Sequence, residues 1–159
     1  MQIQIVAVGN IKEKYLKDAV SEYEKRLSRY CRVTINEVSE EKVPETLSTA
    51  EKEQVLKKEA ERIRNSLLKN TFTVVLDLKG EQPDSPGFSK LLSSWMLQGK
   101  SSISFVIGGS IGLDRKLVKE ADYSLCLSNL TFPHQLTRVI LLEQIYRCFK
   151  IINNETYHK

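Results

Sequence analysis

Short apolar runs rich in β-branched residues alternate with stretches of helical periodicity along the whole chain. The runs typical of strands cover residues 3–8, 33–38, 72–78, 103–107 and 123–127. Apolar side chains recur at helical spacing between them, and Pro133 can open a last helix. Strands separated by helices need crossover connections, which favour a parallel sheet. We therefore expect an α/β fold, with helices on both faces of a mainly parallel sheet.

The length of 159 residues suits one domain, and no repeat or linker divides it, so a single domain over residues 1–159 is expected. The three cysteines form no CxxC pair, which argues against a clustered zinc site, and no metal is expected. The longest apolar run is far shorter than the ~20 residues of a membrane span, and the first residues resemble a strand rather than a leader. A cytoplasmic protein without membrane contact is the expectation. The net charge of +4 permits a polyanionic partner without requiring one.

Three of the predicted strands end in unusual segments, at residues 76–80 (LDLKG), 107–112 (IGGSIG) and 127–133 (LSNLTFP). Ligands of open parallel sheets bind beyond the carboxyl ends of the strands, so these segments form a candidate binding site. Glycines in the second segment permit a close approach of the backbone to a ligand, although a tight turn would use them equally well. Their spacing fits neither the dinucleotide-binding fingerprint nor the phosphate-loop lysine motif, which disfavours NAD and ATP.

The third segment contains apolar and polar residues and leads into the last predicted helix. Its side chains and backbone amides could clamp an adenosine-sized group. The alternative is an ordinary helix start, in which Asn129 or Thr131 accepts hydrogen bonds from the free N–H groups of the first turn. Both interpretations stay open on the sequence alone.

Two further sets of residues could act on an anionic substrate. His134 lies in the first turn of the last helix and Arg138 lies four residues on, so both share a helix face and together could hold a phosphate. The chain ends in Tyr157, His158 and Lys159, which offer an aromatic ring for base stacking, a titratable group and a cation. A frayed terminus and a structural or exposed histidine are the alternatives.

A basic strip, defined here as Lys25, Arg29 and Arg32, follows one side of the first predicted helix and its end. Such a strip can contact the phosphates of a nucleic acid without reading its sequence. The alternative is that these residues form an ordinary solvent-exposed helix face.

Taken together, these motifs resemble the SPOUT, or α/β-knot, RNA methyltransferases, and more narrowly the RlmH family. The resemblance runs from end to end. It rests on residues 5–9 (IVAVG), Leu76-Asp77 with Gly80, residues 105–110 (FVIGGS) with Gly112, residues 132–136 (FPHQL) with Arg138, residues 143–147 (EQIYR) and residues 157–159 (YHK). The FPHQL helix start and the YHK ending are its most specific parts.

The resemblance implies a C-terminal trefoil knot, a rare exception to the unknotted rule. It also implies S-adenosyl-L-methionine as cofactor, a homodimer, and N3 of a pseudouridine in 23S ribosomal RNA of the assembled ribosome as substrate. The cofactor-binding residues carried over by position are Leu76, Gly108, Leu127, Ser128, Asn129, Leu130, Thr131 and Phe132.

On this basis we expect His158, Tyr157 and Arg138 to be catalytic. His158 would lie near the acceptor base, Tyr157 would pack or stack, and Lys159 or Arg138 would supply positive charge. Lys25, Arg29, Arg32, His134 and Lys159 are the expected RNA-binding residues. Two other functions remain alternatives: a non-catalytic RNA- or ribosome-binding module whose pocket holds a nucleotide-like ligand, and a SPOUT enzyme that acts on another RNA.

Overall fold

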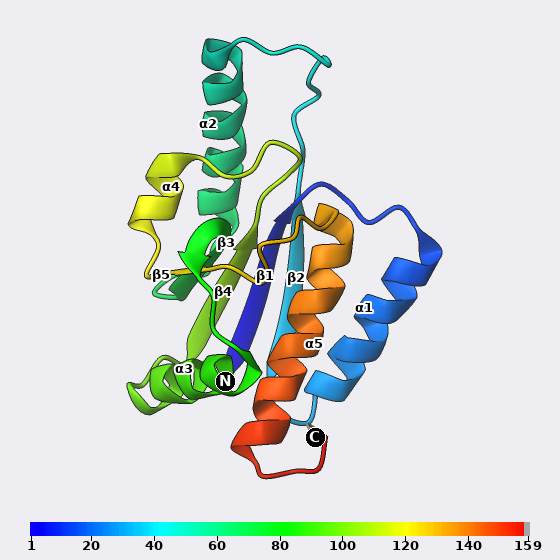
Figure 1. Cartoon of the computed structure of the whole chain (residues 1–159), viewed down its shortest axis with the longest axis vertical. Helices are drawn as coiled ribbons and strands as arrows, with labels where there is room; N and C mark the ends of the chain where they lie inside the picture. The colour runs from blue at the N-terminus through cyan, green and yellow to red at the C-terminus, as the bar shows by residue number, and fades with distance from the viewer. Residues whose placement is uncertain (158–159) are drawn as a thin grey trace.

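The structure, a computed structural model, describes residues 1–157 and confirms the α/β class. Its strands are β1 (Gln2–Val8), β2 (Arg32–Val38), β3 (Phe72–Glu81), β4 (Ser102–Ile107) and β5 (Tyr123–Leu125). They form one five-stranded sheet in the order β2-β1-β4-β3-β5, and every neighbouring pair is parallel (Figure 1). The carboxyl ends of all five strands therefore lie at one end of the sheet.

Helices cover both faces of the sheet, as predicted. The helices α1 (Lys14–Leu27), α3 (Ser85–Leu97) and α5 (His134–Ile152) share one apolar core with Ile3, Ile5 and Ala7 of β1. The helices α2 (Thr49–Ser66) and α4 (Arg115–Glu120) share a second core with Val6 and Val8. Successive side chains of a strand point to opposite faces, so β1 supplies both cores. Its six residues from Ile3 to Val8 are all buried, as expected of a central parallel strand.

The end of β3 differs from the sequence prediction. Residues 79–87 have the composition of a turn, yet β3 continues to Glu81 through an irregularity in which both Leu76 and Glu81 pair with Leu125. A Cβ on Gly80 would lie 2.6 Å from the carbonyl carbon and oxygen of Ser124, so only glycine permits this approach. Residues 77–80 bulge between the paired positions and stand beside the carboxyl end of β4.

Three helix starts carry side-chain caps, and at the start of α4 the Asp114 carboxylate accepts the Leu117 N–H at 3.2 Å. Ser48 and Glu51 form a reciprocal capping box at the start of α2. Asp84 accepts a hydrogen bond from the Gly87 N–H at 2.7 Å, which begins α3 at Ser85, earlier than the apolar pattern from residue 88 predicts. Among the helices of residues 1–157, none combines the length and apolar character needed to cross a membrane.

Candidate functional site

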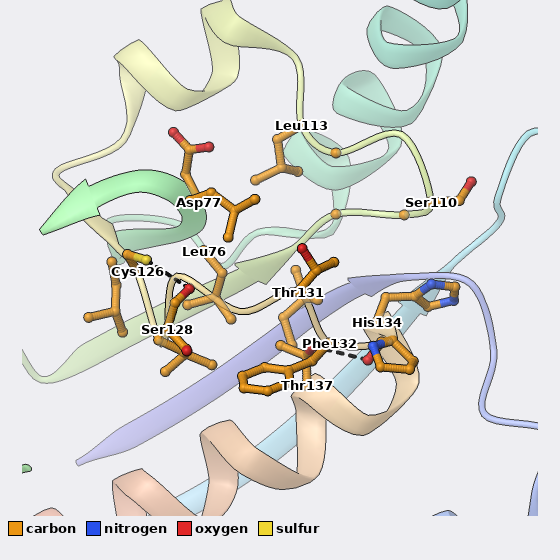
Figure 2. Close-up of a pocket in the computed structure, with 18 of the residues that line it drawn as sticks. Leu76, Asp77, Ser110, Leu113, Cys126, Ser128, Thr131, Phe132, His134 and Thr137 are labelled. Atoms are coloured by element: carbon orange, nitrogen blue, oxygen red, sulfur yellow. Dashed lines mark hydrogen bonds between the residues drawn. The ribbon is translucent and has the colours of Figure 1, made fainter. Parts of the chain in front are cut away.

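A pocket of about 820 Å³ opens at the carboxyl end of the sheet. The ends of β3, β4 and β5 and the first turn of α5 surround it (Figure 2). These are the three strand ends that the sequence analysis selected. The lining residues come from three loop segments and the helix start: residues 76–79, 107–113, 125–128, 130–134 and Thr137.

The wall from β4 is a tight loop closed on itself. Gly112 donates its N–H to the Gly109 carbonyl at 3.1 Å and has a φ of +89°, a conformation that favours glycine. A Cβ on Gly108 would lie 2.7 Å from the Gly112 carbonyl oxygen and 3.0 Å from the Leu113 side chain. The loop therefore requires glycine at position 108, and the same residue lines the pocket. The tight turn and this wall of the pocket are one segment.

The wall from β5 is a compact turn that leads into α5. The Cys126 thiol donates to the Ser128 carbonyl at 3.2 Å, and the Leu130 N–H donates to the Ser128 hydroxyl at 3.0 Å. Within the described part of the chain, no side chain caps the start of α5. The capping alternative for Asn129 and Thr131 is therefore not what the structure shows, and Thr131 instead lines the pocket.

A bidentate ion pair spans the rim between the β3 bulge and α4. Both Arg115 guanidinium nitrogens donate to the Asp77 carboxylate, at 3.0–3.2 Å. Asp77 lines the pocket, and only 14% of its side chain is exposed. It was part of the family motif but was not selected as a site residue. Its position as the one charged residue of the predicted strand 72–78 was the available signal.

Of the eight residues expected to bind the cofactor, seven line the pocket: Leu76, Gly108, Leu127, Ser128, Leu130, Thr131 and Phe132. Asn129 is exposed and is not among the lining residues. In Figure 2 the side chains of Thr131 and Phe132 cross the middle of the view, between Leu76 and His134.

His134 lines the pocket but Arg138 does not. The Arg138 side chain is fully buried and donates to the Glu37 carboxylate at 2.6 Å and to the carbonyls of Val8 and Gly9 at 3.2 and 2.6 Å. Burial lowers the pKa of Arg138, and the Glu37 carboxylate opposes that shift. His134 and Arg138 share a helix face but have different surroundings. His134 borders the pocket, and Arg138 fixes the start of α5 to the ends of β1 and β2.

Tyr157 follows α5, lies away from the pocket and packs back against the second half of that helix. Its hydroxyl donates to Glu143 at 3.1 Å, its ring packs edge-on against Tyr146 at 5.1 Å, and the Arg147 guanidinium lies 4.8 Å from its ring centre. Glu143 is nine positions after His134 in α5, or about 14 Å along the helix axis. Within one chain the structure does not bring Tyr157 to the pocket. His158 and Lys159 lie outside the described residues.

The basic strip lies at the other end of the sheet. Lys25 is in the last turn of α1, Arg29 follows that helix, and Arg32 begins β2. All three are exposed, and they stand at the amino end of the strands. Within residues 1–157, no group of histidine, cysteine and carboxylate side chains is arranged to hold a metal ion.

Comparison with known proteins agrees with this geometry. The family described as "Predicted SPOUT methyltransferase" matches residues 1–158. A protein named ribosomal RNA large subunit methyltransferase H from Ruminiclostridium cellulolyticum is 60% identical over 159 residues, which is 100% of both chains. A protein of the same name from Acetivibrio thermocellus is 55% identical, again over 100% of both chains.

A solved structure gives independent support for the fold. The structure of a probable methylase family protein from Haemophilus influenzae Rd KW20 aligns with a TM-score of 0.55 and 14% identity. The alignment covers 96% of this chain and 66% of that one, and at this identity it bears on the fold alone. The match over nearly the whole chain and the full-length relatives show that this protein belongs to the SPOUT methyltransferases and, within them, to the RlmH family.

Proposed function

We propose that this protein transfers a methyl group from S-adenosyl-L-methionine to N3 of a pseudouridine in 23S ribosomal RNA of the assembled ribosome, in the cytoplasm. The observation that carries the proposal is the full-length similarity, at 55% and 60% identity, to proteins named ribosomal RNA large subunit methyltransferase H. The pocket lies where that activity needs it, at the three strand ends carried over from the family.

The pocket suits a ligand of the cofactor's size and chemistry. Its volume of about 820 Å³ falls within the roughly 300–1,000 Å³ of small-molecule sites. Apolar side chains such as Leu76 and Leu127 can pack against an adenine ring, and the hydroxyls of Ser128 and Thr131 can orient polar groups. S-adenosyl-L-methionine supplies a methyl group on a sulfonium, and the protein supplies binding and orientation.

The acceptor N3–H of pseudouridine is a weak acid and must lose its proton before or during attack. We assign the removal of that proton to His158. Lys159 would stabilise the negative charge that develops on the base, and His134 would hold a phosphate at the pocket rim. Burial and the nearby Glu143 carboxylate raise the pKa of Tyr157, so its phenol stays protonated at neutral pH. Tyr157 would therefore stack or donate a hydrogen bond. Arg138 would act through the position of α5.

The C-terminal tail, residues 157–159, would act on the pocket of a partner subunit in a homodimer. In its own chain Tyr157 is held beside Glu143, about 14 Å along α5 from His134. Four exposed large hydrophobic side chains belong to segments around the pocket end: Tyr15, Leu78, Leu130 and Leu136. The segment before α1 adjoins the first turn of α5 there, since the Lys12 N–H donates to the Gln135 side chain at 3.1 Å. An apolar surface beside an incomplete site is what a shared active site requires.

Incubation with ribosomes that lack the modification, using radiolabelled S-adenosyl-L-methionine, tests the proposal. We expect label in 23S ribosomal RNA, and mapping should place it at N3 of one pseudouridine. Label in transfer RNA instead would identify a SPOUT enzyme of another substrate class. Ligand binding without any labelled RNA would favour the non-catalytic binding module.

A further inference from the structure

Glu40 connects the glycine loop of the pocket to the start of α5. It lies in the connector after β2, and its Oε1 accepts a hydrogen bond from the Ser110 N–H at 3.2 Å. Its Oε2 and the His134 Nε2 lie 3.2 and 3.3 Å from the same point, where a Cβ of Gly9 would stand. One carboxylate thus touches the loop and borders the same space beside Gly9 as the histidine, and Figure 2 shows Ser110 and His134 on the same side of the pocket.

Two glycines make the room for this carboxylate. A Cβ on Gly9 would lie 3.2 Å from the Glu40 Oε2, and a Cβ on Gly109 would lie 3.1 Å from its Oε1. Both distances are tighter than ordinary van der Waals contact. The Glu40 carboxylate therefore occupies space that a side chain at either glycine would take.

The neighbours of Glu40 along the chain are fixed to α2. Arg62 donates to the Ser39 carbonyl at 2.9 Å and to the Glu41 carboxylate at 2.6 Å. The buried Glu59 accepts the Glu41 N–H at 3.1 Å. Because the residues on both sides of Glu40 are tied to the same helix, the connector presents its carboxylate in a set direction. These contacts preorganise the Glu40 carboxylate.

We propose that Glu40 is a positioning residue that holds the glycine loop and His134 in register with each other. The hydrogen bond from an N–H to a carboxylate is charge-assisted and about twice as strong as a neutral one. Losing it would release Ser110, which directly follows the Gly108-Gly109 wall of the pocket. The inference rests on the proposed function, because it assumes that this wall binds the methyl donor.

The test compares Glu40→Ala, Glu40→Gln and the control Glu45→Ala, which changes an exposed glutamate of the same connector. Titration calorimetry with S-adenosylhomocysteine measures affinity, and NMR at fixed pH follows the Ser110 amide and the His134 ring. We expect Glu40→Ala to weaken binding about tenfold, equal to ~1.4 kcal/mol, and to shift both signals. Glu40→Gln keeps an acceptor oxygen, so it should stay within about threefold of wild type but still shift the His134 signals, because the charge is gone. Glu45→Ala should match wild type throughout.

Three outcomes would overturn the inference: wild-type affinity in Glu40→Ala, an unmoved Ser110 amide in that variant, or unmoved His134 signals in Glu40→Gln. Failure of the proposed function looks different, because wild-type protein would then not bind S-adenosylhomocysteine at all. In that case the NMR signals of the variants still decide whether Glu40 positions the loop and the histidine.

Discussion

The two ends of the sheet are built in opposite ways. At the carboxyl end, glycines and a strand bulge leave a pocket of about 820 Å³ open. Toward the amino end, where α1 and α5 finish (Figure 1), aromatic rings pack against one another beside a smaller pocket of about 480 Å³. Tyr30 stacks on Phe149 at 5.4 Å, and Tyr146 packs edge-on against Tyr23, Tyr30 and Tyr157.

This difference separates two tasks within one sheet. The carboxyl end has the backbone and small side chains that a ligand can approach, and the aromatic rings at the amino end hold the last described residues of the chain in place. Tyr30 adds to that hold by donating to Glu155 at 2.8 Å, and Lys150 pairs with the same carboxylate. In the homodimer proposed above, this end would hold the tail for the pocket of the partner subunit, because the pocket of the same chain lies at the other end of the sheet.

The largest effect on methylation should come from removing the C-terminal tail. Deletion of residues 157–159 should leave affinity for S-adenosylhomocysteine within about twofold and lower ribosome methylation by at least ~100-fold, the usual size of an acid–base contribution. Mixing this deletion variant with a Gly108→Ala variant, under conditions in which subunits exchange, should restore part of the activity. One site of the mixed dimer would then combine an intact pocket with an intact tail. Absence of any restoration, despite proven subunit exchange, would show that the tail acts in its own chain.

Gly108→Ala should weaken cofactor binding by at least ~100-fold, equal to ~2.7 kcal/mol. The added Cβ would stand 2.7 Å from the Gly112 carbonyl oxygen, so the loop must move. Calorimetry checks the affinity, and circular dichroism checks the fold. Ser110→Ala is the matched control, because it keeps the backbone N–H that Glu40 accepts. Normal affinity in a folded Gly108→Ala protein would remove the glycine loop from the site.

Arg138→Met should lower the free energy of unfolding by about 3 kcal/mol, as expected when a buried ion pair loses one partner. The substitution leaves the carbonyls of Val8 and Gly9 without their donor. Glu37→Gln, which keeps an acceptor for the guanidinium, should cost about 1 kcal/mol. Urea unfolding measures both. Unchanged stability in Arg138→Met would contradict a positioning role and return this residue to direct action on the substrate.

The smallest effect should come from the basic strip. Replacing Lys25, Arg29 and Arg32 together by glutamine should leave cofactor affinity unchanged and weaken ribosome binding. The salt dependence of that binding should flatten, with a slope smaller by ~0.7 for each phosphate that the strip no longer neutralises. Neutralising Lys52, Lys57 and Lys58 on α2, which are also exposed, provides a control of equal charge. Equally weakened binding in the two triple variants would show a general charge effect rather than a local interaction.

The pocket could be predicted from the sequence because the signals that indicate it are local. Strand composition, the glycines after β4 and the polar segment after β5 are each read within ten residues, and parallel pairing brings their ends together. The two cores could be predicted for the same reason. Family membership carries the C-terminal knot with it.

What the sequence does not predict depends on contacts between distant residues. Ser110 and Glu40 are 70 positions apart, and nothing near either one indicates the other. Helical spacing places His134 and Arg138 on one face, but packing against β1 and β2 decides that Arg138 is buried. The β3 irregularity was missed because Gly80 reads as a turn residue until the backbone of Ser124 is in place.

An NMR titration of isotopically labelled protein with S-adenosylhomocysteine tests the difference between the two ends most directly. We expect saturable shifts in the amides of Leu76, Gly108 and residues 127–132 at the carboxyl end, and unmoved amides at Lys25, Arg29 and Arg32. Shifts confined to the amino end, or no saturable shifts at all, would contradict the account.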